Sequence, residues 1–152
     1  MRKIFFAGTF NPFTIGHDDL VRRALTLFDE VVIGIGINYN KEEDSKNASQ
    51  KGNTLLTIRA LYEKEPCVKV IEYNGITAQV AREQGCCALL RGIRTVKDYE
   101  YELQMADVNK ALTGIETVIL TAKPEYSFIS SSMLRDLKSH GIDISKYLPY
   151  QA

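Results

Sequence analysis

A histidine follows a glycine-containing loop near the start of the chain. The segment GTFNPFTIGH covers residues 8–17, between an apolar run and a helical pattern that begins at about His17. Free N–H groups and the positive dipole end attract phosphate at a helix start. Gly8 and Gly16 let the backbone approach a ligand, and His17, protonated or as a neutral N–H donor, can stabilise charge that develops on a phosphoryl oxygen. Alternatively, Asn11-Pro12 merely forms a turn and His17 sits in the first helical turn, although the strand–loop–helix context is the one that a phosphate site requires.

Two arginines, Arg91 and Arg94, follow a short apolar run. Guanidinium groups beyond a strand end can offer bidentate donors to a polyphosphate or a phosphomonoester. The alternative is surface ion pairing with Asp98 or Glu100, which contributes little. Asp98 and Glu102 stand one helical turn apart and share a face. We expect them to orient the arginines or to accept hydrogen bonds from ribose hydroxyls. A metal pair and a solvated acidic helix face are the alternatives.

A run of serines precedes the last long helical pattern. The segment YSFISSS covers residues 126–132, and Met133, Leu134 and Leu137 follow at helical spacing. One serine is enough to cap a helix. Three consecutive serines therefore predict a second phosphate cradle, formed by backbone N–H groups and hydroxyls.

The elements that must position these residues alternate along the chain. Short β-branched and apolar runs predict strands at residues 4–7, 31–37, 68–73, 88–90 and 117–121. Helical periodicity predicts helices from about residue 17, around 56–61, and at 77–84, 98–112 and 132–140. Strand–helix alternation predicts an α/β, Rossmann-like, doubly wound, five-stranded parallel sheet with helices on both faces. We expect one domain over residues 1–152, with ligands beyond the carboxyl ends of the strands.

Composition excludes several classes of protein. Lys plus Arg equals Asp plus Glu at 19 each, which removes the basic footprint of a general nucleic-acid binder. Cys67, Cys86 and Cys87 show no CxxC spacing, so neither a disulfide framework nor a zinc site is supported. No apolar run reaches transmembrane length, and the first apolar run is too short for a signal peptide. We expect a cytoplasmic protein without nucleic-acid or membrane partners.

Four motifs together resemble the bacterial phosphopantetheine adenylyltransferases over almost the whole chain. They are Gly8-Thr9-Phe10-Asn11-Pro12 with Thr14-Ile15-Gly16-His17, Arg91-Gly92-Ile93-Arg94, Asp98-Tyr99-Glu100-Tyr101-Glu102 with Gln104-Met105, and Ser127-Phe128-Ile129-Ser130-Ser131-Ser132. The TxGH element alone indicates the nucleotidylyltransferase superfamily, and the other three are more specific. The resemblance implies transfer of AMP from ATP to 4′-phosphopantetheine, which gives dephospho-coenzyme A and pyrophosphate.

The same resemblance implies roles for individual residues. His17, Lys41 and Arg91 would be catalytic, and Thr9, Lys41, Thr77 and Arg91 would contact phosphopantetheine. The ATP site would comprise Thr9, Phe10, His17, Gly92, Ile93, Arg94, Glu102, Tyr126, Ser127, Phe128, Ile129, Ser130, Ser131 and Ser132. Mg²⁺ would arrive with ATP, without a dedicated protein metal site. A homohexamer and feedback binding of coenzyme A are also implied.

The chain departs from the family pattern at three places. Asn11 stands where Asp is common, Thr77 stands where a larger apolar residue is usual, and the polar segment 38–53 around Lys41 is lengthened. Such a long segment is typical of either a functional lid or a solvated loop. The residues after it, NTLLTIR at 53–59, also differ from the usual motif.

The chemistry itself asks little of the protein. A phosphate monoester is already an oxygen nucleophile, so we expect direct in-line displacement at the α-phosphorus, with no covalent intermediate. Sister enzymes that use nicotinate mononucleotide, or that transfer CMP to a small phosphate ester, are alternatives. A non-catalytic nucleotide-binding module is another, although His17 with both arginines weighs against it. All of these readings require His17, Arg91 and the start of the helix near Ser132 to share one crevice.

Overall fold

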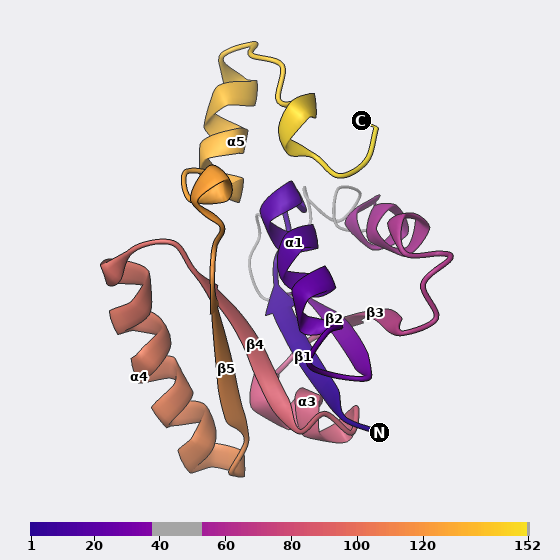
Figure 1. Cartoon of the computed structure of the whole chain (residues 1–152), viewed down its shortest axis with the longest axis vertical. Helices are drawn as coiled ribbons and strands as arrows, with labels where there is room; N and C mark the ends of the chain where they lie inside the picture. Colours follow the sequence, from indigo (N-terminus) through magenta and orange to yellow (C-terminus); the bar gives the residue numbers. More distant parts are fainter. Residues whose placement is uncertain (38–52, 152) are drawn as a thin grey trace.

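The computed structural model describes residues 1–37 and 53–151, which form a five-stranded sheet with helices on both faces (Figure 1). The strands are Lys3–Gly8 (β1), Glu30–Gly36 (β2), Val68–Tyr73 (β3), Ala88–Ile93 (β4) and Glu116–Thr121 (β5). The helices are Ile15–Ala24 (α1), residues 53–61, Thr77–Glu83 (α3), Val96–Thr113 (α4) and Ser131–Ser139 (α5). Two 3-10 turns, Pro124–Tyr126 and Ser145–Tyr147, flank α5.

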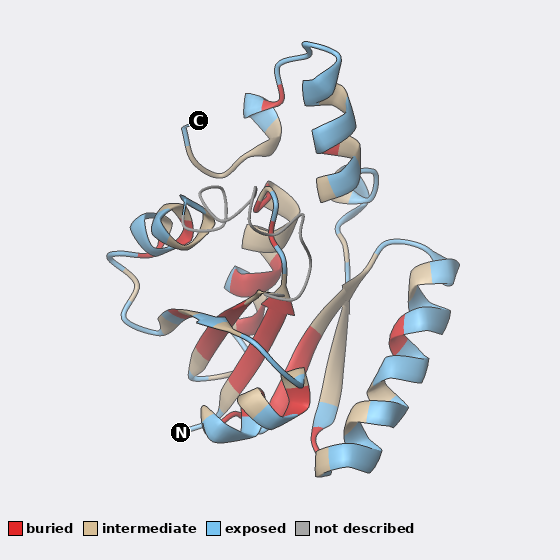
Figure 2. Cartoon of the chain, turned by 180° about the vertical axis from the view of Figure 1, so that it is seen from behind, coloured by how far each residue is buried: buried red, intermediate tan, exposed pale blue. Residues whose placement is uncertain are grey.

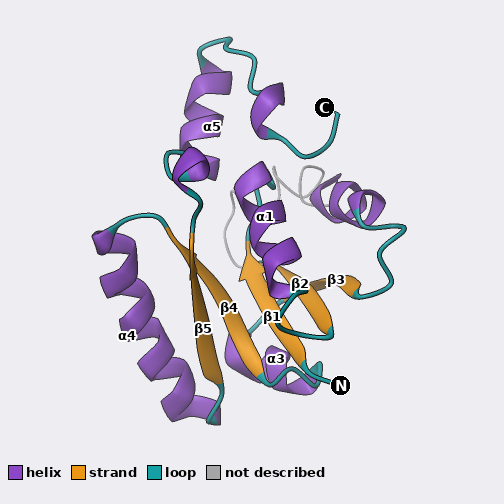
Figure 3. Ribbon diagram, viewed as in Figure 1, coloured by secondary structure: helices purple, strands orange, loops and turns teal. Residues whose placement is uncertain are grey.

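The sheet is parallel throughout and has the strand order β3-β2-β1-β4-β5 (Figure 3). The chain moves outward from β1 to β3 and then crosses to β4 on the other side of β1. The order therefore switches between β1 and β4, which is where ligands bind in open α/β sheets. The carboxyl ends of the strands share one edge, and α5 lies beyond that edge (Figure 1). The α/β sheet predicted from the sequence is confirmed.

Alternate residues of the central strand serve opposite faces of the sheet. Ile4 and Phe6 pack with α1 and the helix at residues 53–61, whereas Phe5 and Ala7 pack with α3. Burial is concentrated in the middle strands (Figure 2). Each fully buried large apolar side chain contributes about 1.5–3 kcal/mol. These two cores make β1 a rigid support for the loop that follows it.

A third, smaller core attaches α5 to the rest of the molecule. Ile129, Leu134 and Ile144 are buried there, with Ile15 of α1 packed against them. The start of α1 and the start of α5 are therefore fixed relative to one another. Among residues 1–37 and 53–151, none of the helices combines the length and apolar character needed to span a bilayer.

Several predicted boundaries are corrected by the structure. Strand β4 continues to Ile93, so Arg91 belongs to the strand and does not follow it. Helix α1 begins at Ile15, two residues before His17, because Thr14 caps it. Helix α5 begins at Ser131, one residue before the predicted start, because Ser130 is its N-cap.

The apolar stripe expected on α4 is not buried. Glu102 is the buried residue of this helix, whereas Tyr101, Met105, Val108 and Leu112 are 36–59% exposed. The helix lies at the β5 edge of the sheet and contacts α3, β4 and β5. Its stripe lines a cavity instead of a packed core.

Substitution of Gly34 tests how tightly β2 packs against β1. A Cβ at Gly34 would lie 2.2 Å from Cζ of the buried Phe5 ring. Gly34→Ala should lower the free energy of unfolding by about 1–3 kcal/mol, because the ring must leave its position. Gly36→Ala, on the same strand, is the control, because its new Cβ would be 3.5 Å from the nearest atom. Urea denaturation that shows equal effects for the two variants would contradict this packing.

Candidate active site

Two cavities open at the carboxyl edge of the sheet. The first, of about 330 Å³, is lined by the β1–α1 loop, the end of β4, the start of α4, the segment after β5 and the start of α5. The second, of about 450 Å³, lies between α3 and α4 over the other face of the sheet. They share five lining residues: Ala7, Gly8, Thr9, Arg91 and Glu102. We call these five residues the junction.

His17 is fixed by a capping box at the start of α1. The backbone N–H of His17 donates to Oγ1 of Thr14 at 3.2 Å, and the backbone N–H of Thr14 donates to Nδ1 of His17 at 2.9 Å. Because a backbone N–H can only donate, Nδ1 of His17 must be unprotonated. The ring proton therefore resides on Nε2. The spacing of Thr14 and His17 thus determines both the position of the ring and its tautomer.

Aromatic side chains enclose the same ring. Phe13 stacks on His17 with ring centroids 5.2 Å apart, and Phe10 meets it edge-on at 5.1 Å. Burial, together with the positive charges of Arg91 and Arg94, lowers the pKa of His17 to about 4. His17 is therefore a neutral N–H donor at pH 7. It lines the first cavity, where a neutral donor can stabilise developing negative charge.

Arg91 is held at the junction by three hydrogen bonds. Nε and Nη2 each donate to one carboxylate oxygen of Glu102 at 2.8 Å, and Nη1 donates to the carbonyl of Ala7 at 2.8 Å. Burial lowers the pKa of Arg91, but the hydrogen bonds to Glu102, the charge of Glu102, and the influence of Tyr101 and Tyr73 together raise it above its usual value. A guanidinium has five N–H groups. Two therefore remain, one on each Nη, and they can donate to phosphate oxygens.

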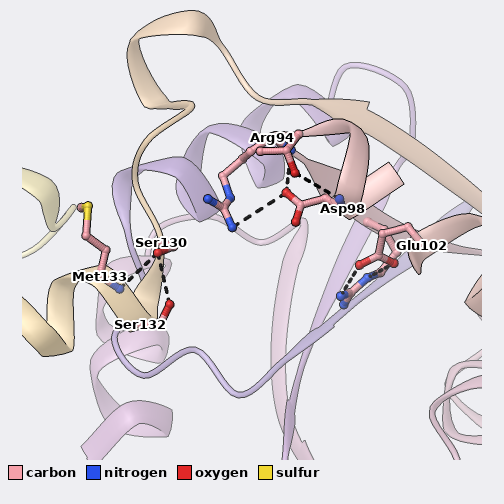
Figure 4. A network of polar contacts seen from close by, with 8 residues as sticks. Arg94, Asp98, Glu102, Ser130, Ser132 and Met133 are labelled. Atoms are coloured by element: carbon pink, nitrogen blue, oxygen red, sulfur yellow. Dashed lines mark hydrogen bonds and ion pairs between the residues drawn. The ribbon is translucent and has the colours of Figure 1, made fainter. Parts of the chain in front are cut away.

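Arg94 and Asp98 form a more open pair in the first cavity (Figure 4). Oδ2 of Asp98 accepts the backbone N–H of Arg94 at 3.0 Å and lies 3.8 Å from Nη2 of Arg94. Asp98 thus orients Arg94, as Glu102 orients Arg91. The expected shared face of the two carboxylates is confirmed, but the partner of Arg91 is Glu102 and not Asp98 or Glu100.

Each of the three serines at the start of α5 has a different partner. Ser130 accepts the backbone N–H of Met133 at 3.1 Å, and its hydroxyl lies 3.3 Å from that of Ser132 (Figure 4). Ser131 donates to the carbonyl of Pro12 at 2.8 Å. Ser131 therefore ties the start of α5 to the β1–α1 loop.

Most of the predicted ATP residues line the first cavity. Those that do are Thr9, Phe10, His17, Gly92, Ile93, Arg94, Glu102, Tyr126, Ile129, Ser130 and Ser131. Ser127, Phe128 and Ser132 line neither cavity. The Phe128 ring packs edge-on against Tyr147 instead, with centroids 6.0 Å apart. Thr77 lines the second cavity, and Lys41 lies outside the described residues.

Two charged residues of the first cavity were missed from the sequence. Asp19 binds Arg23 at 3.2 Å and Lys123 at 3.2 Å, and both Asp19 and Lys123 line the cavity. Lys123 follows the carboxyl end of β5, and that position was the available signal. No pattern pointed to Asp19, which reaches the cavity through the rotation of α1.

The carboxylates of this cavity are already paired with cations. Glu102 binds Arg91, Asp98 binds Arg94, and Asp19 binds Arg23 and Lys123. Within residues 1–37 and 53–151, no group of three or more His, Cys, Asp or Glu side chains is arranged to hold a metal ion. The cavity is thus built from paired cations and N–H donors, a donor set that suits a polyphosphate.

Comparison with known proteins identifies the family. The cytidylyltransferase-like family matches residues 5–137. A phosphopantetheine adenylyltransferase from Bacteroides thetaiotaomicron is 46% identical over 98% of this chain and 96% of its own length. One from Phocaeicola vulgatus is 47% identical over 98% of this chain and 96% of its own length. The chain belongs to the phosphopantetheine adenylyltransferase family. Its members are nucleotidyltransferases, so the resemblance of the four motifs is confirmed.

Solved structures support the fold at much lower identity. A bifunctional NMN adenylyltransferase/ADP ribose pyrophosphatase from Francisella tularensis, complexed with AMP and a manganese ion, has a TM-score of 0.66 and 15% identity. The match covers 99% of this chain and 45% of that chain. The fold of this chain is therefore shared with part of that protein.

The ring of His17 should titrate near pH 4. Its pKa is lowered from 6.5 to about 4, so between these values the unfolded chain binds more protons than the folded chain. The contribution of His17 to the free energy of unfolding should therefore increase as the pH rises from 4 to 6.5. Above pH 6.5 this contribution should stay constant. Long-range proton–nitrogen NMR should show a protonated Nε2, with the signal assigned by its absence in His17→Asn. A midpoint at or above 6.5, or a proton on Nδ1, would contradict the capping-box geometry.

Proposed function

We propose that this chain transfers AMP from ATP to 4′-phosphopantetheine and releases pyrophosphate and dephospho-coenzyme A. Its membership of the phosphopantetheine adenylyltransferase family supports this reaction. The single structural observation that carries it is the junction, where two cavities meet at one arginine. Transfer between two substrates requires their reacting groups to be adjacent, and the junction provides that adjacency.

ATP occupies the first cavity in this proposal. The triphosphate lies among Nε2 of His17, the guanidinium of Arg94 and the start of α5 at Ser130 and Ser131, all of which line the cavity. The free N–H groups of the first turn of α5 are suited to a phosphate group. The nucleoside extends toward Tyr126 and Ile129, in the segment that precedes α5.

The acceptor occupies the second cavity, with its phosphate at the junction. Arg91 retains two N–H donors there, and Thr9 is exposed at the same place. The arm then runs between α3 and α4, along the exposed stripe of Met105, Val108 and Leu112. A largely apolar groove suits a long flexible arm with few charges. This placement also gives the unburied stripe of α4 a role.

The protein contributes placement and charge stabilisation to the reaction. The acceptor phosphate attacks the α-phosphorus of ATP directly, and pyrophosphate leaves on the opposite side. His17 donates a hydrogen bond from Nε2 to an α-phosphoryl oxygen. Because the ring is neutral, it supplies a directional hydrogen bond but no full positive charge. Arg91, which lines both cavities, holds the acceptor phosphate and the adjoining α-phosphate of ATP, and Arg94 holds the rest of the triphosphate. Lys41 remains a predicted catalytic residue.

Mg²⁺ arrives bound to ATP in this proposal. The paired state of Asp19, Asp98 and Glu102 fits an ion that is held chiefly by phosphate oxygens and water. When bound, the ion neutralises phosphate charge and favours departure of pyrophosphate. The protein residues then need only orient the triphosphate.

Three further properties belong to the same proposal. Coenzyme A contains both an adenine nucleotide and a pantetheine arm, so it can occupy both cavities as a feedback ligand.

Val96, Tyr99 and Leu103 form a second exposed stripe on α4, 45–76% exposed, which supports burial in a homohexamer. Cys67, Cys86 and Cys87 are free thiols, which fits the reducing cytoplasm.

Release of pyrophosphate from ATP and Mg²⁺ tests the proposed function. We expect release that depends on phosphopantetheine, not on nicotinate mononucleotide, and that fails when CTP replaces ATP. His17→Ala should lower kcat by about 10²–10³ with little change in either KM, because the donor acts in the transition state. His140→Ala, an exposed position after α5, is the control and should keep full activity. Release with nicotinate mononucleotide instead, or tight ATP binding without any release, would refute the proposal.

A further inference from the structure

Two charged side chains of the first cavity are assigned no substrate contact in the proposed transfer. Asp19 belongs to α1, and Lys123 follows the carboxyl end of β5. Oδ1 of Asp19 lies 3.2 Å from Nζ of Lys123, and both residues line the cavity. We call these two side chains the charged pair.

Asp19 is held in place by a second cation. Nη1 of Arg23 lies 3.2 Å from Oδ2 of Asp19 and also donates to the carbonyl of Thr121 at 2.8 Å. Arg23 thus ties the carboxylate to the last residue of β5, close to Lys123 in the chain. The side chain of Asp19 is 11% exposed, whereas that of Lys123 is 48% exposed. The carboxylate is therefore a fixed acceptor, and the ammonium is the more accessible member of the pair.

The lining beside the charged pair suits a nucleobase. Leu20, the next residue after Asp19, lines the cavity, and so does Ala122. Nζ of Lys123 lies 5.9 Å from the ring centroid of Tyr126, at the nucleoside end of the proposed ATP site. Apolar and aromatic surfaces favour the flat faces of a base, whereas a phosphate group needs clustered N–H donors. The charged pair is therefore placed to meet a polar edge of the base.

The charged pair presents a hydrogen-bond donor beside an acceptor. An ammonium has three N–H groups, of which Lys123 uses one on Asp19. A carboxylate accepts about four hydrogen bonds, of which Asp19 receives one from Arg23 and one from Lys123. Adenine has the matching edge, because its amino group donates and the neighbouring ring nitrogen accepts. A 6-oxo purine instead turns an oxygen toward the carboxylate, so that two acceptors face each other.

We propose that the charged pair reads the base of the nucleotide and selects a 6-amino purine over a 6-oxo purine. Asp19 accepts a hydrogen bond from the amino group, and Lys123 donates one to the adjacent ring nitrogen. Arg23 is a positioning residue, because it holds Asp19 and does not line the cavity. This inference rests on the proposed function, since it assumes that ATP lies in the first cavity.

Kinetics with ATP and ITP test this inference, because the two nucleotides differ in the group at position 6. The unmodified enzyme should favour ATP over ITP in kcat/KM by roughly tenfold or more, since the wrong base leaves a charged group without its partner. Asp19→Asn should bring the two values to within about threefold, because an amide can turn its NH2 group toward the oxygen of ITP. The KM for phosphopantetheine should stay unchanged.

The ratio of the two kcat/KM values separates base recognition from general damage, since a lower yield of folded enzyme does not alter a ratio. Lys138→Met, an exposed position on α5, is the control and should keep both the ratio and the KM for ATP. If the unmodified enzyme uses ATP and ITP equally, the inference is overturned. It is also overturned if Asp19→Asn lowers both kcat/KM values by the same factor.

Two analogues of ATP separate a contact with the base from a contact with phosphate. In 1-deaza-ATP and in 7-deaza-ATP, carbon replaces one of the two ring nitrogens nearest the amino group. Lys123→Met should raise the KM for ATP roughly three- to tenfold, the effect of one net hydrogen bond. With one of the two analogues, the unmodified enzyme and Lys123→Met should share the same KM. No increase with ATP, or an equal increase with ATP and both analogues, would overturn the role of Lys123.

Calorimetric binding of ATP and ITP separates failure of the inference from failure of the proposed function. Enzyme that prefers ATP to ITP, and loses this preference in Asp19→Asn, but releases no pyrophosphate would refute the proposed reaction alone. Enzyme that releases pyrophosphate with phosphopantetheine but binds and uses ATP and ITP alike would overturn this inference alone.

Discussion

The ion pair between Arg91 and Glu102 is the interaction on which the site depends. Glu102 is buried on α4, and both of its oxygens accept hydrogen bonds from Arg91 at 2.8 Å. Loss of one partner from such a pair leaves a poorly solvated charge, which is costly. The pair also links α4, β4 and, through the carbonyl of Ala7, β1. It therefore fixes the wall between two cavities and the cation that both cavities share.

The other groups of the site are arranged around that fixed cation. The capping box occupies Nδ1 of His17, a residue that lines the first cavity, and leaves the ring proton on Nε2, while Arg91 and Arg94 help to keep the ring neutral. Ser131 joins the start of α5 to the β1–α1 loop. Two helix starts and one strand end thus meet over the switch point of the sheet. A transferase that acts through placement needs this convergence more than it needs a nucleophile.

The local apolar pattern of the sequence was enough to predict the parallel sheet and the meeting of the four motifs at one edge of it. Apolar β-branched runs marked the strands, and parallel topology brings strand ends to one edge. The identity of contacts was harder to predict, because it depends on side-chain direction. Ser130, Ser131 and Ser132 look equivalent in sequence, yet each has a different partner. The tautomer of His17 could be inferred only from the Thr14 N–H that it accepts.

Burial was the least predictable property. The Tyr101-to-Leu112 stripe of α4 has the spacing of a core-facing helix, but it faces an open cavity. Periodicity shows which residues share a helix face and says nothing about what the face meets. Asp19 was missed for a related reason, because the rotation of α1 decides that it faces the cavity. Lys123 was missed although its position just after β5 was a signal.

Kinetics of two matched carboxylate variants test the central claim most directly. Glu102 orients Arg91, which lines both cavities, whereas Asp98 orients Arg94, which lines the first cavity alone. Glu102→Gln should raise KM for ATP and for phosphopantetheine together, each by about tenfold or more. Asp98→Asn should raise KM for ATP alone. If Glu102→Gln changes the KM of only one substrate, or of neither, the two substrates do not meet at Arg91 and the account is contradicted.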